Sequence, residues 1–310
     1  MRRNSLDIAI IGTGAIGGYY GARLAHDGHD VHFLLHTEYD YVKAHGLTVD
    51  SHFGDFSLTQ PNVYRHVDEM PPCDLVCVAV KTTVNRQVFP QIRPVLKDGG
   101  GILLMQNGFG YEQQLAELYP NQHILGGMCF ICSFRDGPGV IRHTDYGMMT
   151  LAELAESDAD NRDFLTRIAQ IFTHAGVDTD VKNNLTEARI RKLMWNIPYN
   201  GMSVLGNCRT DVLVTNPALR SATRAVMGEI LEAAQACGVP IEASFADKMV
   251  QLTDEMEPYD PSMRLDFLAG RPLETEAIYG NFIGYAQAHG YDMRYAKMMK
   301  WQLEYLQARK

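Results

Sequence analysis

The segment 7–28, DIAIIGTGAIGGYYGARLAHDG, places three glycines in the order G-T-G-A-I-G directly after a short apolar run. Residues 8–11 suit a buried parallel strand, residues 15–25 a helix that a glycine at position 28 ends, and residues 30–35 a second strand. Strand, turn, helix and strand thus fit within about thirty residues, which is the context that a dinucleotide-binding G-x-G-x-x-G motif requires. A glycine-rich turn without a ligand is the alternative, and the flanking elements rank it second.

Each glycine of the motif has a distinct expected role. Gly12 permits the sharp turn out of the strand, and Gly14 lets backbone amides approach a pyrophosphate. Gly17 lets the helix pack closely on the sheet, so that the amides of its first turn face the phosphates. The candidate cofactor-binding residues of this segment are Gly12, Thr13, Gly14, Ala15, Ile16 and Gly17.

Charge and hydropathy exclude several classes of partner. The chain of 310 residues has 28 Lys and Arg against 37 Asp and Glu, a net charge of −9. This balance argues against a broad nucleic-acid or anionic-membrane surface. No apolar run approaches the roughly 18 residues that a membrane span needs, and the N-terminal apolar stretch is too short for a signal peptide. We therefore expect a cytoplasmic protein of one or two domains.

The cysteines and histidines give no metal-ligand pattern. Cys129 and Cys132 form the only C-x-x-C among six cysteines. A redox pair or half of a zinc site is possible, but no second pair or histidine cluster completes it, so buried thiols are favoured. The eleven histidines are scattered, and no metal is predicted.

Polar residues end two further apolar runs. Lys81 ends the run 73–81, and Asn107 lies in the Gln-Asn-Gly that ends the run 101–108. In an open parallel sheet, ligands bind outside the carboxyl ends of the strands, so both side chains point to the edge that carries the glycine turn. A solvated strand end and an N-G turn are the respective alternatives. Residues 123–130 suggest another strand, and 140–143 with 148–152 suggest a terminal hairpin-like pair.

The character of the sequence changes at residue 184, after which helical spacing alternates with Gly and Pro. The predicted fold class is α/β, with an N-terminal Rossmann-type doubly wound sheet followed by an all-helical C-terminal domain. We place the dinucleotide-binding domain at 1–182 and the substrate and catalytic domain at 183–310. A cleft between such halves is the default active site.

The first helix of the second half carries Lys192, Asn196 and Asn200 at i, i+4 and i+8. Each four-residue step drifts only about 40° around an α-helix, so the three side chains share one face. A solvent-facing stripe is the alternative. Pro198 lies between the asparagines and is expected to kink the helix.

A second polar group lies in the segment 261–281. It contains Ser262, and Gly270-Arg271-Pro272 breaks one helix and opens the next, placing Glu274 in the first turn of that helix. Compensation of the helix dipole is the alternative role for this carboxylate.

Together these motifs resemble the ketopantoate reductase (2-dehydropantoate 2-reductase) family. They are the N-terminal G-x-G-x-x-G, Lys81, QNG at 106–108, RKLMWN at 191–196, SMRLD at 262–266 and GRPLETEAIYG at 270–280. The match runs nearly end to end. It implies NADPH-dependent reduction of a 2-keto acid to its 2-hydroxy acid, in this family 2-dehydropantoate to pantoate, a step of pantothenate biosynthesis.

The resemblance also implies roles for individual residues. Lys192 would be the general acid, Asn196 and Asn200 would bind substrate oxygens, and Ser262 would bind the substrate carboxylate. Glu274 would hydrogen-bond Lys192 or the cofactor. The cofactor side would further be lined by His36, Lys81, Asn107 and Ser133.

The sequence departs from the family pattern at two places. After Arg-Pro it has Leu273-Glu274-Thr275-Glu276, so Glu276 competes with Glu274, although alignment on the flanking glycines favours Glu274. Where the family often has an arginine that pairs with the 2′-phosphate of NADPH, this chain has His36. No carboxylate stands at the strand tip, and Glu38 lies slightly beyond it, so NADP(H) is the expected cofactor.

Two other functions are considered. One is a related 2-hydroxy-acid dehydrogenase that acts on a bulkier or aromatic 2-keto acid. The other is a non-catalytic NADPH-sensing regulator, which would need the glycine turn but not Lys192 or Glu274. The expected partner is a small 2-keto acid, with no nucleic acid and no membrane, and the apolar C-terminal helices leave room for a homodimer.

Overall fold

The computed structural model describes residues 5–154 and 159–309. The chain divides into two compact units, each described here by itself. The first comprises Met1–Gln106 and Tyr111–Leu185, and the second comprises Asn107–Gly110 and Thr186–Lys310. The chain therefore passes from one unit to the other at three points along its length.

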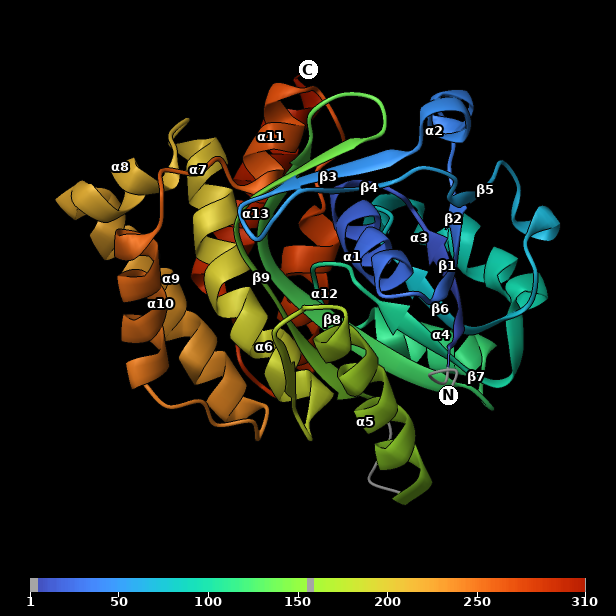
Figure 1. The fold of residues 1–310 in the computed structure, drawn as a ribbon. Helices are drawn as coiled ribbons and strands as arrows, with labels where there is room; N and C mark the ends of the chain where they lie inside the picture. The colour runs from blue at the N-terminus through green and yellow to red at the C-terminus, as the bar shows by residue number, and fades with distance from the viewer. Residues whose placement is uncertain (1–4, 155–158, 310) are drawn as a thin grey trace. The chain divides into compact units, whose positions relative to one another are not determined.

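The first unit alternates strands and helices (Figure 1). Its strands are β1 (Asp7–Ile11), β2 (Asp30–Leu34), β3 (Leu47–Ser51), β4 (Phe56–Leu58), β5 (Asn62–Tyr64), β6 (Cys73–Val78), β7 (Leu96–Leu104), β8 (His123–Arg135), β9 (Val140–Glu153) and β10 (Thr179–Val181). Its helices are α1 (Ala15–His26), α2 (Tyr39–His45), α3 (Asn85–Val88), α4 (Tyr111–Leu118) and α5 (Ala159–His174), with short 3₁₀ turns η1 (Val67–Glu69), η2 (Thr82–Val84) and η3 (Phe89–Val95).

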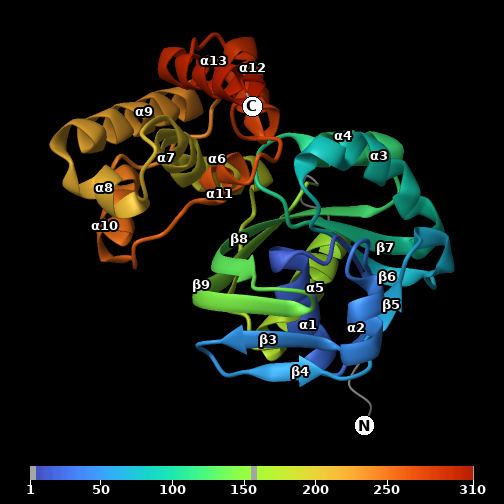
Figure 2. The same cartoon turned by 90° about the horizontal axis from the view of Figure 1, so that it is seen from above.

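Within the described residues, these strands form one sheet in the order β4-β3-β9-β8-β7-β6-β1-β2-β5, with β10 pairing β9. The strands from β8 to β5 run parallel to one another. Figure 2 shows β4, β3, β9 and β8 side by side at the other edge. The chain order reverses direction at β1, between β6 and β2, which is the switch point where doubly wound sheets bind ligands.

Alternation along β1 explains why both faces of the sheet are covered. Ile8 and Ile10 belong to one apolar cluster, together with residues of α1 and α5. Ala9 and Ile11 belong to another, together with residues of η3 and α4. A strand buried on both faces reads as a continuous apolar run, as this one does. The predicted fold class, an α/β sheet domain followed by a helical domain, is confirmed.

One predicted pair of strands is wrong. Residues 140–143 and 148–152 are not the two arms of a hairpin but parts of the single strand β9, which pairs antiparallel with β8 along its length. Tyr146 and Gly147 have positive φ angles of 59° and 117°. They shift the register by a bulge without reversing the chain, which is why two short apolar runs occur in one strand.

The second unit is helical and is built around one apolar core. Its α-helices are α6 (Leu185–Trp195), α7 (Gly201–Leu205), α8 (Thr210–Thr215), α9 (Pro217–Ala236), α10 (Ser244–Glu255), α11 (Ser262–Leu268), α12 (Asn281–Ala288) and α13 (Arg294–Ala308). Two π-helical turns, η4 (Asn196–Asn200) and η5 (Glu276–Gly280), lead directly into α7 and α12. No helix formed by the described residues is both long and apolar enough to cross a membrane.

The four residues 107–110 are an integral part of this helical unit. Phe109 is 5 % exposed and its ring lies 5.5 Å from that of Phe282 and 5.0 Å from that of Tyr285. Its N–H donates to the carbonyl of Ala277 at 3.0 Å, and Asn281 donates to its carbonyl at 2.7 Å. A side chain on the neighbouring residue, Gly108 (φ +102°), would come within 2.6 Å of the Ala277 carbonyl. Glycine is therefore needed for this close approach.

Candidate functional site

The glycine turn has close backbone neighbours at its first and third glycines and none at its second. Gly12 has a φ of +99°, and a Cβ there would lie 2.7 Å from the backbone nitrogen of Val80. A Cβ on Gly17 would lie 2.2 Å from the carbonyl oxygen of Gly12. At Gly14, by contrast, a Cβ would meet nothing within 4 Å. The fold therefore needs glycine at the first and third positions. At the second position the space beside the backbone is open, so a ligand could approach the backbone amides there.

Gly14 opens onto a pocket of about 580 Å³ in the first unit. The pocket lies at the carboxyl ends of the central strands and is lined by Gly12, Thr13, Gly14, Leu34, Leu35, His36, Thr37, Glu38, Arg65, His66, Val80 and Arg135. Among these, the sequence had indicated the glycine turn and His36. It had not indicated Arg65, which follows β5, or Arg135, which ends β8, because both reach the pocket only through strand pairing.

The carboxylate that could hold a ribose hydroxyl is already engaged. Glu38 is 9 % exposed and forms an ion pair with Arg135. Its other oxygen accepts a hydrogen bond from the N–H of Gly139 at 3.3 Å. A buried carboxylate with these two partners is not disposed to turn toward a sugar.

Arg65 and Arg135 are about equally exposed, but Arg65 has a different partner. Its side chain is 45 % exposed, and its guanidinium lies 4.4 Å from the ring centroid of Tyr39. It donates to Asp40 at 2.5 Å, and this hydrogen bond raises the pKa of Arg65. The guanidinium therefore stays charged and is held flat against a ring at the rim of the pocket.

Lys81 and Ser133 also belong to the first unit. Lys81 is exposed and directly precedes η2, following a segment fixed by Gln106, which donates to the carbonyl of Val80 at 2.6 Å. Gln106 and Asn85 exchange two further hydrogen bonds through their buried amides. Ser133 lies on β8, and its buried hydroxyl has no hydrogen-bond partner within the described part of the chain.

The stripe Lys192, Asn196 and Asn200 is interrupted by η4, so it does not follow a regular α-helix. Pro198 lacks an N–H, and it lies within the π turn η4. In a π turn a four-residue step falls short of a full turn, whereas in an α-helix it overshoots by about 40°. The two deviations oppose each other, which aligns the stripe better than a regular helix would. The solvent-facing alternative is wrong for the asparagines, which are 2 % and 1 % exposed.

Both asparagines hydrogen-bond within the helical unit. The Asn196 amide donates to the side-chain oxygen of Asn107 at 3.1 Å. The side-chain oxygen of Asn200 accepts from the N–H of Met263 at 3.1 Å, in the first turn of the helix that Ser262 begins. Three segments far apart in the sequence, around residues 107, 196–200 and 262, are thus joined by side-chain amides.

A tyrosine connects the two π turns. The hydroxyl of Tyr279 in η5 donates to the carbonyl of Ile197 in η4 at 2.7 Å. Burial raises the pKa of Tyr279 well above its usual range, so the hydroxyl remains a donor. Gly201 makes room for it, because a Cβ there would lie 2.1 Å from the hydroxyl oxygen.

The environments of Glu274 and Glu276 differ. Glu276 is exposed and forms an ion pair with Lys300 at 3.2 Å. Glu274 is 6 % exposed. It does not lie in the first turn of a helix, as expected, but just before the helical segment, where its carbonyl accepts from the N–H of Ile278. The helical segment begins at Thr275, one residue after Glu274, and the bond from Ile278 to Glu274 is an i to i−4 bond at its start.

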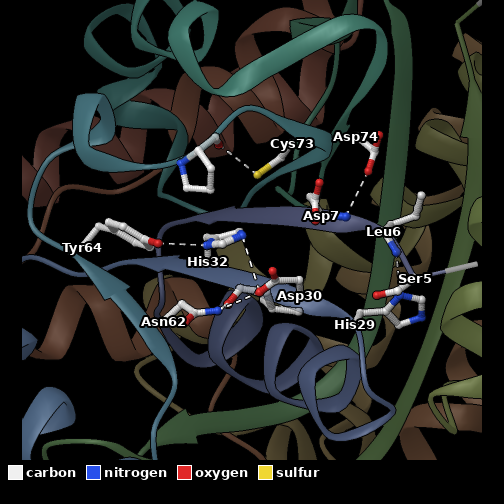
Figure 3. Close-up of polar contacts among 12 residues, drawn as sticks. Ser5, Leu6, Asp7, His29, Asp30, His32, Asn62, Tyr64, Cys73 and Asp74 are labelled. Carbon is white, nitrogen blue, oxygen red and sulfur yellow. Dashed lines mark hydrogen bonds and ion pairs between the residues drawn. The ribbon is translucent and has the colours of Figure 1, made fainter. Parts of the chain in front are cut away.

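A further polar cluster lies at the opposite edge of the sheet. Asp7, Asp30 and His32 stand at the amino ends of β1 and β2 with ligand-type atoms within 4.8 Å of one another (Figure 3). His32 contacts the Tyr64 hydroxyl at 3.1 Å, and Lys97 donates to Asp7 at 2.6 Å. Lys97 also donates to Asp74 at 3.1 Å, so it compensates the charge of Asp7, whereas Asp30 lies 3.6 Å from His32. The cluster lies away from the glycine turn.

Comparison with known proteins agrees with this arrangement. The family model "Ketopantoate reductase PanE/ApbA" matches residues 8–156, and "Ketopantoate reductase PanE/ApbA C terminal" matches residues 184–303. A 2-dehydropantoate 2-reductase of Nostoc sp. is 43 % identical over 308 residues, covering 99 % of this chain and 97 % of its own.

Solved structures agree as well. That of 2-dehydropantoate 2-reductase from Geobacter metallireducens superposes with a TM-score of 0.92 at 39 % identity, covering 96 % of this chain and 99 % of its own. The enzyme from Methylococcus capsulatus gives 0.87 at 33 % identity, covering 98 % and 97 %. A D-mandelate dehydrogenase with NADH and anilino(oxo)acetate shares the fold, with a TM-score of 0.85 at 18 % identity, covering 98 % and 99 %.

The first unit carries the glycine turn on a Rossmann-type sheet, and the second is a helical unit with buried side-chain amides. This combination defines a two-domain oxidoreductase that uses a nicotinamide cofactor. Within that class, the chain belongs to the ketopantoate reductase family.

Proposed function

We propose that this chain reduces 2-dehydropantoate to pantoate with NADPH in the cytoplasm, as a step of pantothenate biosynthesis. The observation that carries the proposal is a pair of hydrogen bonds made by the two buried asparagines that follow α6, the helix that bears Lys192. Asn196 bonds to Asn107, and Asn200 bonds to the backbone of Met263, next to Ser262. It accompanies 43 % identity over nearly the whole length to a 2-dehydropantoate 2-reductase.

The residue types fit the chemistry of a 2-keto acid. Reduction develops negative charge on the C2 carbonyl oxygen, and the ammonium of Lys192 would give that oxygen a proton. Asn196 and Asn200 would donate to substrate oxygens. For Asn200 the amide NH₂ would serve, because its side-chain oxygen already accepts from Met263. Ser262 would bind the substrate carboxylate, and the buried Glu274 would orient Lys192 or the cofactor.

The first unit fits a nicotinamide dinucleotide. The space beside Gly14 would admit the pyrophosphate, with Gly12, Thr13, Ala15 and Ile16 around it and Gly17 bringing α1 close to the sheet. When bound, the reduced nicotinamide would supply the hydride. Lys81 and Ser133 of the first unit and Asn107 of the helical unit, which bonds to Asn196, are further candidates for contacts with the cofactor. We also propose that residues 1–182 form the dinucleotide-binding domain and that residues 183–310 form the substrate and catalytic domain.

The test is cofactor oxidation, followed by absorbance, against a panel of 2-keto acids that includes 2-dehydropantoate, branched aliphatic acids and aromatic acids such as phenylglyoxylate. We expect the highest kcat/KM with 2-dehydropantoate. Turnover of an aromatic acid with none of 2-dehydropantoate would establish the related 2-hydroxy-acid dehydrogenase instead. Tight NADPH binding without turnover of any acid would favour the NADPH-sensing regulator.

We also propose a homodimer formed through α13. This helix buries Ala296, Met299 and Leu303 but leaves large apolar side chains exposed on its other face. They are Tyr295, Met298, Trp301 and Tyr305, with exposed fractions of 48 %, 50 %, 64 % and 62 %. The ketopantoate reductase of Staphylococcus aureus is dimeric.

The apolar area that α13 exposes is large enough to form much of a dimer interface, and one substitution on it tests the proposal. Four such side chains expose roughly 500 Å², a large part of the about 800 Å² that each partner contributes to a stable interface. Sedimentation should give a dimer for the wild type and a monomer for Trp301→Glu, whereas a monomeric wild type would refute the proposal.

A further inference from the structure

The pocket beside the glycine turn contains two arginines that the family resemblance did not indicate. Arg65 and Arg135 both line it, together with His36. The two arginines differ in their partners, since Arg135 is paired with the buried Glu38, whereas Arg65 is paired with Asp40, whose side chain is 84 % exposed. Only a pairing with an exposed carboxylate is readily exchanged for a stronger anion.

The position of Arg65 follows from strand register. β5 pairs parallel with β2, with Leu34 opposite Tyr64, and the N–H of Leu35 donates to the carbonyl of Tyr64 at 2.9 Å. Arg65 is the first residue after β5 and therefore stands beside the tip of β2. In dinucleotide-binding sheets that tip is where the 2′ position of the adenosine ribose is recognised.

We infer that Arg65, rather than His36, is the residue that selects the 2′-phosphate of NADPH in this chain. This inference rests on the proposed use of a nicotinamide dinucleotide. A phosphate monoester carries up to two negative charges and would draw the guanidinium from Asp40 into a bidentate contact. Stacking on Tyr39 holds the planar group in place while its hydrogen bonds are exchanged.

The surrounding charges support this assignment. α2 presents Asp40, Tyr39 and Lys43 to Arg65, and η1 presents Glu69, whose carboxylate accepts from the backbone N–H groups of Arg65 and His66. The pairing of Glu38 with Arg135 removes the carboxylate that would otherwise favour NADH and repel a phosphate. The two carboxylates near the guanidinium, Asp40 and Glu69, are both exposed to solvent, where their charge is screened.

The experiment measures binding by calorimetry, without turnover, for NADPH, NADH, adenosine 2′,5′-bisphosphate and adenosine 5′-monophosphate. The variants are Arg65→Gln, His36→Gln and the control Arg93→Gln. Arg93 is matched because it also stacks on a tyrosine, at 4.7 Å from the Tyr119 ring, but does not line the pocket. Arg65→Gln should weaken NADPH and the bisphosphate 10- to 100-fold, or about 1.4 to 2.8 kcal/mol, and leave NADH and the monophosphate within about twofold.

The control and His36→Gln should retain most of the preference for the phosphorylated ligands. The preference of the wild type should also persist between about pH 7 and pH 8.5, because a guanidinium keeps its charge throughout that range. A preference that survives Arg65→Gln and is lost in His36→Gln would overturn the inference while leaving NADPH as the cofactor. A wild type that prefers NADH would overturn both the inference and the proposed cofactor, but not the reduction of a 2-keto acid.

Discussion

Truncation of Phe109 tests whether the segment 107–110 truly belongs to the core of the helical unit. In Phe109→Ala the ring that packs between Phe282 and Tyr285 is lost, and with it the contact that holds the segment against α12. Truncation of a buried phenylalanine costs about 3 to 5 kcal/mol. Because a short connecting segment can relax into the space, we expect the lower end, about 3 kcal/mol.

The tryptophans make the assay specific for this unit. Both of them, Trp195 in α6 and Trp301 in α13, lie in the helical unit, so urea unfolding followed by tryptophan fluorescence reports its stability. With a slope of about 2 kcal/mol/M, the midpoint should fall by about 1.5 M. The control Phe53→Ala removes a ring that is 57 % exposed in the first unit and should shift the midpoint by less than about 0.5 M. Equal midpoints for the two variants would refute the assignment of residues 107–110 to this core.

Three further perturbations have defined outcomes. Lys192→Ala should lower kcat by about 10²- to 10⁴-fold with NADPH affinity nearly unchanged, and near-normal turnover in a steady-state assay would remove the lysine from the mechanism. Gly14→Val should abolish NADPH binding in calorimetry without loss of the fold, since a side chain there meets open space, and the matched Gly228→Val, also open, should bind normally. Burial lowers the pKa of His143 to about 4, so the unfolded chain takes up a proton that the folded chain excludes, and stability should fall by up to about 3 kcal/mol as pH drops from about 6.5 to 4. The urea midpoint of His143→Gln should therefore fall less than that of the wild type as the pH is lowered from about 6.5 to 4. The same fall in both proteins would contradict this role of His143.

Features encoded by neighbouring residues could be predicted from the sequence. The glycine turn needs three glycines at fixed spacing between a strand and a helix, and all of that lies within one short segment. The burial of Asn196 and Asn200 could not be predicted in the same way, because a polar stripe on an isolated helix is equally compatible with solvent. What buries these asparagines is contact with Asn107 and Met263, far away in the sequence.

The two arginines of the pocket could not be predicted either, because strand pairing between distant segments brings them there. β5 has three residues and follows a proline, so no periodic pattern marks it as a strand, yet its pairing with β2 brings Arg65 to the pocket. Arg135 reaches the pocket as the last residue of the long strand β8. Pro198 gave a signal for a helix irregularity, whereas the second π turn, at 276–280, contains no proline and gave none.

The bond between the two π turns restricts how the length of the chain can change. A π turn holds one residue more than an α-helical turn over about the same rotation, so deletion of one residue within η4 would change the backbone of that turn and leave the helix beyond it in nearly the same orientation relative to Lys192. The carbonyl of Ile197 would then turn away from Tyr279, whose buried hydroxyl would lose its acceptor. A deletion in η5 would displace the same hydroxyl from the other side. Point substitutions in these turns can be absorbed locally, but a change in the length of either turn would break the hydrogen bond between Tyr279 and Ile197.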